Sequence, residues 1–225
     1  MTAPHPATLK AQLRALLSID RVVTEAQLER WGLVGAATWL DLPRVTRTCR
    51  TRVTQSESDT ALTFVALTNG DLKRSPRDLM HLAALAEARR TKVLEPGEVW
   101  RHVTLRGRSK ANQADAEIIQ TLDPRRRSDW AVEFDAGYAP GRIAQKLEGA
   151  VTAGYSRVLW ATSIHVRTRT VAAQVVMLRL QGRLPELTLI ETRFVDFWSP
   201  HDPYSNRPRC HKPMGVAHRF QARAG

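Results

Sequence analysis

Three acidic residues, Asp115, Glu133 and Asp135, have a spacing that suits metal-dependent phosphodiester chemistry. Asp115 stands at the start of the stretch ADAEII, and Glu133 follows 18 positions later in the stretch DWAVEFD. Side chains alternate between the two faces of a strand, so Glu133 and Asp135 share one face. Carboxylate oxygens suit Mg²⁺ or Mn²⁺, which can activate water and stabilise a phosphodiester transition state. The three carboxylates are therefore the predicted metal ligands, with Mg²⁺ or Mn²⁺ as the cofactor.

Lys146 is the candidate cationic partner of these acids. It lies in a predicted helix over residues 139–153, between the inward-facing Ile143 and Leu147, so its ammonium group could reach the same site. There it would neutralise developing negative charge, which completes the candidate catalytic set. The alternative is structural: the two acids of DWAVEFD face solvent at a sheet edge or pair with the arginines at 125–127.

Four arginines, Arg44, Arg47, Arg50 and Arg52, follow one predicted strand and are candidate DNA contacts. At ~3.3 Å per residue they span roughly 25–30 Å, which is enough to follow several phosphates. The alternative is a solvated edge strand on which positive charge discourages aggregation. The preceding helix, residues 35–42, has no Arg, Lys, Asn or Gln to read base edges. Binding to the phosphate backbone is therefore the expected mode.

Two further sets of basic residues are candidate DNA contacts. Arg167 and Arg169 lie in the stretch SIHVRTRT, at the start of a predicted helix, where backbone N–H groups could bind a phosphate. A helix start whose arginines face water is the alternative. Residues 199–225 show no hydrophobic period and are expected to form a flexible basic arm that orders on DNA. The contacts expected from this arm are Arg207, Arg209 and Lys212.

The charge of the chain indicates nucleic acid as its partner. The 225 residues carry a net charge of +12, concentrated at the two ends of the chain. Residues 1–110 have 18 basic and 11 acidic side chains, and residues 200–225 have five basic and one acidic. A polyanion attracts such a surface because binding releases the counterions of its phosphates. Double-stranded DNA is the expected partner.

The remaining composition argues against several other classes of protein. No apolar stretch approaches the roughly 18–20 residues that cross a bilayer, so a cytoplasmic protein without a membrane partner, associated with the nucleoid or a plasmid, is expected. Cys49 and Cys210 are expected to be free thiols. The chain lacks the P-loop, GxGxxG, GxSxG and HExxH motifs. Nucleotide hydrolysis, dinucleotide redox chemistry and serine hydrolysis are therefore not expected.

Residues 1–74 are predicted to form a winged helix-turn-helix domain that positions the arginine-rich strand. Apolar residues recur at helical spacing and then change to period two. The predicted elements are helices over 8–17, 25–32 and 35–42 and strands over 44–53 and 62–66. Three short helices followed by a hairpin are the winged variant of the helix-turn-helix.

A predicted connecting helix, residues 75–95, leads to an α/β domain over 96–198 and a basic tail over 199–225. The predicted strands are 98–105, 114–119, 130–135, 157–162 and 187–198, and the helices are 139–153 and 168–180. Alternation of strands and helices predicts a sheet covered by helices, so the expected class is α/β within an overall α+β chain.

A set of short motifs runs through residues 8–198: LTNGD, a helix around His81, ADAEII, VEFDAGY, KLEGAVTAGY, and RVLWATS followed by Arg167. By these motifs the sequence resembles the replication-relaxation family, plasmid and mobile-element proteins with a winged helix and a restriction-endonuclease-like domain. The resemblance implies DNA binding, a role in plasmid replication or DNA relaxation, and acids placed as in PD-(D/E)XK nucleases.

On this resemblance Asp115 would be the first acid and Glu133 the second. Asp135 stands where an active nuclease usually has lysine, which leaves Lys146 as a substitute from the next helix and argues against cleavage. The leading expectation is a DNA-binding protein acting in plasmid or chromosome replication, maintenance or topology. One alternative is a Mg²⁺- or Mn²⁺-dependent endonuclease or nickase. Another is a homodimeric transcriptional regulator in which the apolar helix 35–42 packs on the second copy.

Overall fold

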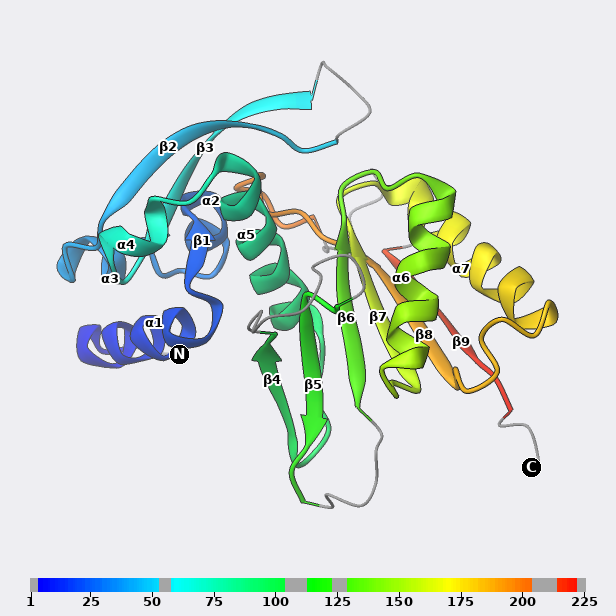
Figure 1. Cartoon of the computed structure of the whole chain (residues 1–225). Helices are drawn as coiled ribbons and strands as arrows, with labels where there is room; N and C mark the ends of the chain where they lie inside the picture. Colours follow the sequence, from blue (N-terminus) through cyan, green and yellow to red (C-terminus); the bar gives the residue numbers. More distant parts are fainter. Residues whose placement is uncertain (1–3, 53–57, 104–112, 123–128, 204–213, 222–225) are drawn as a thin grey trace. The chain divides into compact units, whose positions relative to one another are not determined.

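The computed structural model describes residues 4–52, 58–103, 113–122, 129–203 and 214–221. The chain divides into two compact units (Figure 1). Unit 1 comprises Met1–Thr91 and Asp196–Arg207, and unit 2 comprises Lys92–Val195 and Pro208–Gly225. The whole is a mixed α+β protein with one sheet in each unit.

Three helices near the start of unit 1 match the predicted ones: α1 (Pro6–Asp20), α2 (Glu25–Arg30) and α3 (Val34–Trp39). Thr24 caps α2, because its hydroxyl accepts from the Gln27 N–H while the Gln27 side chain accepts from the Thr24 N–H. The apolar faces of the three helices pack together. Members of this core include Leu13, Leu17, Leu28, Leu33, Ala37 and Val65.

The sheet of unit 1 is antiparallel, with the strand order β1-β3-β2. The predicted hairpin is formed by β2 (Arg44–Arg50) and β3 (Asp59–Ala66), which pair from Arg44↔Val65 to Arg50↔Asp59. β1 (Val22–Thr24), which the sequence analysis did not predict, pairs with the other edge of β3. The candidate contact Arg52 lies just beyond the end of β2.

The helix expected to connect the two parts of the chain belongs to unit 1. The short helix α4 (Asn69–Leu72) precedes α5 (Pro76–Thr91), and α5 contacts α1, β1 and β2. Eight of its side chains are buried, mostly alanine and leucine, so it is a core helix of unit 1 rather than a linker. Unit 1 therefore extends to Thr91 instead of ending at residue 74.

Unit 2 contains a six-stranded mixed sheet with the order β4-β5-β6-β7-β8-β9. β4, β5 and β6 are antiparallel, β6, β7 and β8 are parallel, and β9 is antiparallel to β8. The strands are β4 (Glu98–His102), β5 (Ala116–Gln120), β6 (Trp130–Asp135), β7 (Arg157–Thr162), β8 (Leu189–Phe194) and β9 (Gly215–Arg219). Two helices, α6 (Pro140–Thr152) and α7 (His165–Leu180), follow β6 and β7 and pack on the sheet (Figure 1).

The prediction that residues 199–225 have no regular structure was wrong for its described end, because Gly215–Arg219 form β9. The strand begins with a glycine because the backbone of Thr192 comes very close to position 215. A Cβ at position 215 would lie 2.5 Å from the Thr192 carbonyl oxygen, closer than a side chain can come. The last predicted strand, 187–198, was also too long, since β8 ends at Phe194 and Asp196 begins the second segment of unit 1.

In the part of the chain that the structure describes, no helix is both long and apolar enough to cross a membrane.

Candidate functional site

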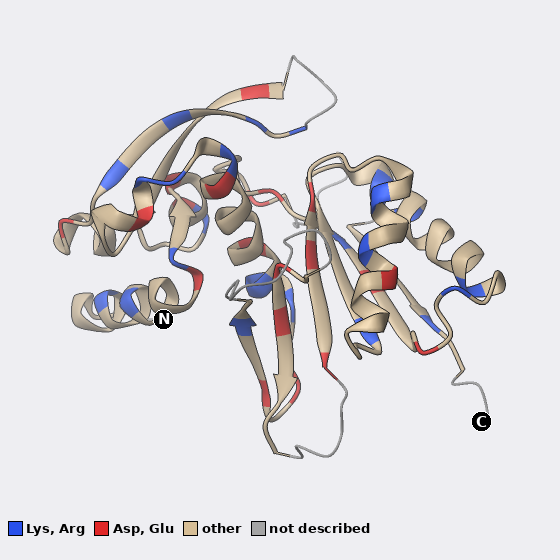
Figure 2. Cartoon of the chain, in the orientation of Figure 1, with Lys and Arg blue, Asp and Glu red and all other residues tan. Residues whose placement is uncertain are grey.

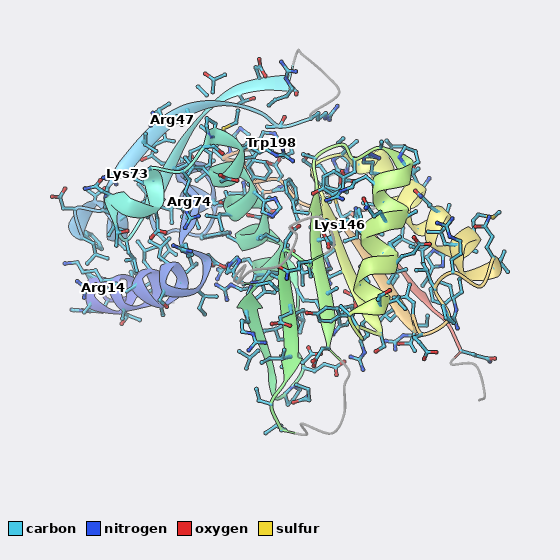
Figure 3. The ribbon with its side chains drawn as sticks, in the orientation of Figure 1. Arg14, Arg47, Lys73, Arg74, Lys146 and Trp198 are labelled. Atoms are coloured by element: carbon cyan, nitrogen blue, oxygen red, sulfur yellow. The ribbon has the colours of Figure 1, made fainter. Side chains whose placement is uncertain are left out.

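The predicted lysine and the second acid meet in the interior of unit 2. Lys146, which is labelled in Figure 3, lies on α6, and Glu133 lies on β6. Lys146 Nζ lies 2.9 Å from Glu133 Oε2 and 3.2 Å from Glu133 Oε1. Only 1% of Glu133 and 3% of Lys146 is exposed. A buried ion pair of this kind is costly to break, because either partner alone would be a desolvated charge.

Asp115 joins this pair at the end of the chain segment that leads into β5. Its Oδ1 lies 3.8 Å from Lys146 Nζ, and its Oδ2 accepts a hydrogen bond of 2.8 Å from the Phe134 N–H on β6. Lys146 also donates to the Gln113 carbonyl at 2.7 Å. One ammonium group thus contacts two carboxylates, one on β6 and one directly before β5. We call Asp115, Glu133 and Lys146 the acid–lysine cluster.

The electrostatics of the cluster favour a protonatable Glu133. Burial raises the pKa of the Glu133 carboxyl well above its ordinary value, and the adjacent Asp115 carboxylate raises that pKa further. The Lys146 ammonium acts in the opposite direction. A carboxyl with a raised pKa beside a cation and a second acid can hold or transfer a proton, which is the arrangement that acid–base chemistry requires.

Asp135 has a different set of contacts. Its Oδ1 accepts from the Gly137 N–H at 2.6 Å, and its Oδ2 lies 3.4 Å from Trp160 Nε1 and 3.4 Å from Arg167 Nε. Arg167 also donates to the Tyr138 carbonyl. Asp135 therefore stabilises the turn after β6 and pairs with Arg167. Contact of Arg167 with a phosphate stays a prediction.

Tyr138 is a site residue that the sequence analysis did not single out. Burial raises the pKa of its phenol, and the carboxylates of Asp115, Glu133 and Asp135 raise it further. Its ring packs edge-on against Trp160 with the centroids 6.3 Å apart. The phenol is thus a neutral hydroxyl close to three acids. Its place in the motif VEFDAGY, three residues after Asp135, was the available signal.

The positions of Asp115, Glu133 and Asp135 can be compared with the metal site predicted for them. Among the described residues no three His, Cys, Asp or Glu side chains are grouped so that they could hold a metal ion. Two of the three predicted ligands, Asp115 and Glu133, lie together, whereas Asp135 is taken up by Arg167 and the turn. The solvent-facing alternative is wrong, because Glu133 and Asp135 are buried, and residues 125–127 lie outside the described part. Metal binding stays a prediction.

The hairpin arginines differ in their contacts. Arg44 Nε lies 3.5 Å from Glu25 Oε1, and Arg50 Nε lies 3.0 Å from Asp59 Oδ1. Arg47 is exposed, and its guanidinium group donates a hydrogen bond to the carbonyl oxygen of Thr46. Because β2 alternates, Arg47 shares its face with the buried Cys49 and not with Arg44 and Arg50.

Unit 1 has further exposed cations on other elements. Arg14 on α1, Lys73 at the end of α4 and Arg77 on α5 are exposed, and none forms an ion pair with another described residue. Figure 2 shows the basic positions on α1 and β2, and Figure 3 labels Arg14, Arg47 and Lys73. In unit 2 Arg169 is exposed on α7. The predicted contacts of the tail, Arg207, Arg209 and Lys212, lie outside the described residues.

Comparisons with protein-family models, with curated proteins and with solved structures found no match to this chain.

Proposed function

We propose that this chain binds DNA through unit 1, mainly by contacts to the phosphate backbone. The observation that carries the proposal is the set of exposed, unneutralised cations in unit 1, on a chain whose net charge is +12. Its members on the described surface include Arg14, Arg47, Lys73 and Arg77. Cations that are not neutralised by neighbouring acids can replace the counterions of a phosphate chain, which drives association.

The order of elements in unit 1 supports the same proposal. Helices α1, α2 and α3 precede the hairpin β2–β3, which is the order typical of a winged helix-turn-helix. Asp115, directly before β5, and Glu133, on β6, are compatible with a nuclease-like domain, which the resemblance to the replication-relaxation family implies. We therefore place the DNA-binding activity in plasmid or chromosome replication, maintenance or topology.

Replacing Arg47 by alanine is expected to weaken duplex binding and to lower the dependence of log K on log salt by about 1, as for one lost phosphate contact. The expectation follows from the exposed position of Arg47 on β2. The measurement is fluorescence anisotropy of a labelled duplex at several salt concentrations.

Arg183→Ala is the matched control, since Arg183 is an exposed arginine of unit 2 that pairs with Glu148 at 2.6 Å. Its slope should equal that of the wild type. Equal slopes for Arg47→Ala and the wild type would remove Arg47 from the binding surface.

A second candidate function is a metal-dependent nickase or endonuclease, which the acid–lysine cluster favours. Asp115 and Glu133 would hold Mg²⁺ or Mn²⁺, and the ion would supply Lewis-acid activation of water. Lys146, whose ammonium group lies 2.9 Å from Glu133 Oε2, would neutralise charge on the reacting phosphate. The competition between Lys146 and a metal for Glu133 is the feature that argues for binding alone.

Supercoiled plasmid incubated with the protein in EDTA, Mg²⁺ or Mn²⁺ separates the two functions. An active site of this kind gives metal-dependent open circles or linear DNA, and Glu133→Gln, which keeps the size of the side chain, should abolish them while leaving gel retardation nearly unchanged. Retardation without any change of topology leaves the DNA-binding function alone. Cleavage that survives in Glu133→Gln would show that the acid–lysine cluster is not the active site.

A further inference from the structure

The surface of unit 1 carries an aromatic side chain that backbone binding does not explain. Trp39, at the end of α3, is 51% exposed, although tryptophan is usually well covered in folded proteins. Its six-membered ring lies over Gly35 one turn earlier, where a Cβ would come 3.6 Å from the ring. The glycine thus lets the indole lie close to the helix backbone, and about half of the surface of Trp39 stays accessible to a ligand.

Cations adjoin this indole from a second helix. Lys10 Nζ lies 5.9 Å from the centre of the Trp39 ring, and Arg14 stands one turn further along the same side of α1. Beside Trp39, Thr38 is exposed and accepts a hydrogen bond from Arg44 Nη2 at 3.4 Å. We call Lys10, Arg14, Thr38 and Trp39 the Trp39 patch. Glu25 pairs with Arg44, and neither Lys10 nor Arg14 forms an ion pair with another described residue.

We propose that the Trp39 patch binds unpaired nucleotides, with one base stacked on the indole and the adjoining phosphates against Lys10 and Arg14. This inference rests on the DNA binding proposed above and names the form of DNA that this surface prefers. An aromatic platform beside cations is complementary to a single strand, because every base has a face that can stack and every nucleotide a negative charge.

A closed duplex fits this surface less well. Within a duplex the faces of the bases are covered by their neighbours, and only their edges are accessible in the grooves. The exposed residues of α3, which include Gly35, Thr38 and Trp39, offer one hydroxyl and no amide or guanidinium to read those edges. The indole would therefore add little to duplex binding, whereas on a single strand it contributes a full stacking contact.

The test compares a labelled single strand with a duplex of the same length, by anisotropy at one low salt concentration. Trp39→Ala should weaken single-strand binding about 5- to 100-fold, the loss of one stacked base, and change duplex binding less than about 3-fold. Trp39→Phe keeps a ring that can stack and should recover most of the affinity. Since Trp39 is half exposed, its removal leaves no buried cavity, and thermal unfolding of both variants checks that they are folded.

The possible failures can be told apart. If the wild type binds neither DNA at low salt, the proposed function fails together with this inference. If it binds the duplex alone, or if Trp39→Ala weakens both forms equally or neither, the DNA-binding function stands and the assignment of the Trp39 patch is overturned. A dimer of the free protein that Trp39→Ala dissociates, measured by sedimentation, would assign the patch to a second copy of the chain and also overturn it.

Discussion

Lys146→Met lowers the free energy of unfolding of unit 2 by about 3–5 kcal/mol, the cost expected when one partner of a buried ion pair is removed. The cause is Glu133, which is 1% exposed and would lose the ammonium group 2.9 Å from its carboxylate, while Asp115 remains beside it. Methionine keeps most of the length of the lysine chain, so little of the loss comes from a cavity. Urea denaturation followed by tryptophan fluorescence measures the effect.

Two further variants identify the cause. Lys146→Met combined with Glu133→Gln should be more stable than Lys146→Met alone, because no buried carboxylate is then left uncompensated at position 133. Arg183→Met, which breaks the exposed pair with Glu148, should change stability by less than about 1 kcal/mol. If the double variant is no more stable than the single one, the loss comes from packing rather than from charge.

The same group sets a pH dependence. The folded pKa of Glu133 lies above its value in the unfolded chain, so the folded state binds this proton more tightly. Protonation of Glu133 therefore contributes to the free energy of unfolding. This contribution is fully present below the ordinary pKa of a glutamate and is lost as the pH rises through the raised pKa of the folded state. Lys146→Met removes the ammonium group that lowers the pKa of Glu133. The loss of unfolding free energy caused by this substitution should therefore be larger at about pH 8 than at about pH 5.

The sequence predicted well the elements that are defined by local signals. Apolar residues at helical spacing predicted the helix over 25–32 that is α2, and the runs at 130–135 and 157–162 gave the bounds of β6 and β7 without error. β1 and β9 were missed for a physical reason. β1 has three residues, too few to show a period, and β9 has the polar sequence GVAHR and is held by its pairing with β8, a contact distant in the sequence.

The sequence predicted which residues lie at the candidate site, but not which cation pairs with which acid. Alternation along β6 gave the common face of Glu133 and Asp135, and helical spacing gave the inward position of Lys146. Which cation each acid receives depends on how α6 and α7 pack on the sheet, which no local pattern contains. The pairing of Arg167 with the buried Asp135 is therefore a contact that the sequence pattern does not predict.

Arg30→Met is expected to destabilise unit 1 by about 3–5 kcal/mol, because it removes the cation from a second buried pair. Arg30 Nη2 lies 2.7 Å from Glu87 Oε2, and the two side chains are 5% and 1% exposed. The guanidinium group also donates to the carbonyl oxygens of Asp196 and Ser199, so it holds the segment that follows β8 within unit 1. Urea denaturation gives the stability, and limited proteolysis followed by mass spectrometry shows whether cleavage near residues 196–203 accelerates.

Glu87→Gln combined with Arg30→Met separates the two roles of this arginine. Without a carboxylate at position 87 no uncompensated charge is left at that position, and Gln27, which donates to Glu87 at 2.8 Å, still offers a partner to an amide. Stability should therefore be largely recovered, whereas rapid proteolysis of 196–203 should persist, because the two carbonyl contacts are still missing. Arg50→Met, at the exposed pair with Asp59, should alter neither quantity appreciably. If proteolysis slows together with the recovery of stability, the segment is held by the packing of unit 1 as a whole and not by Arg30.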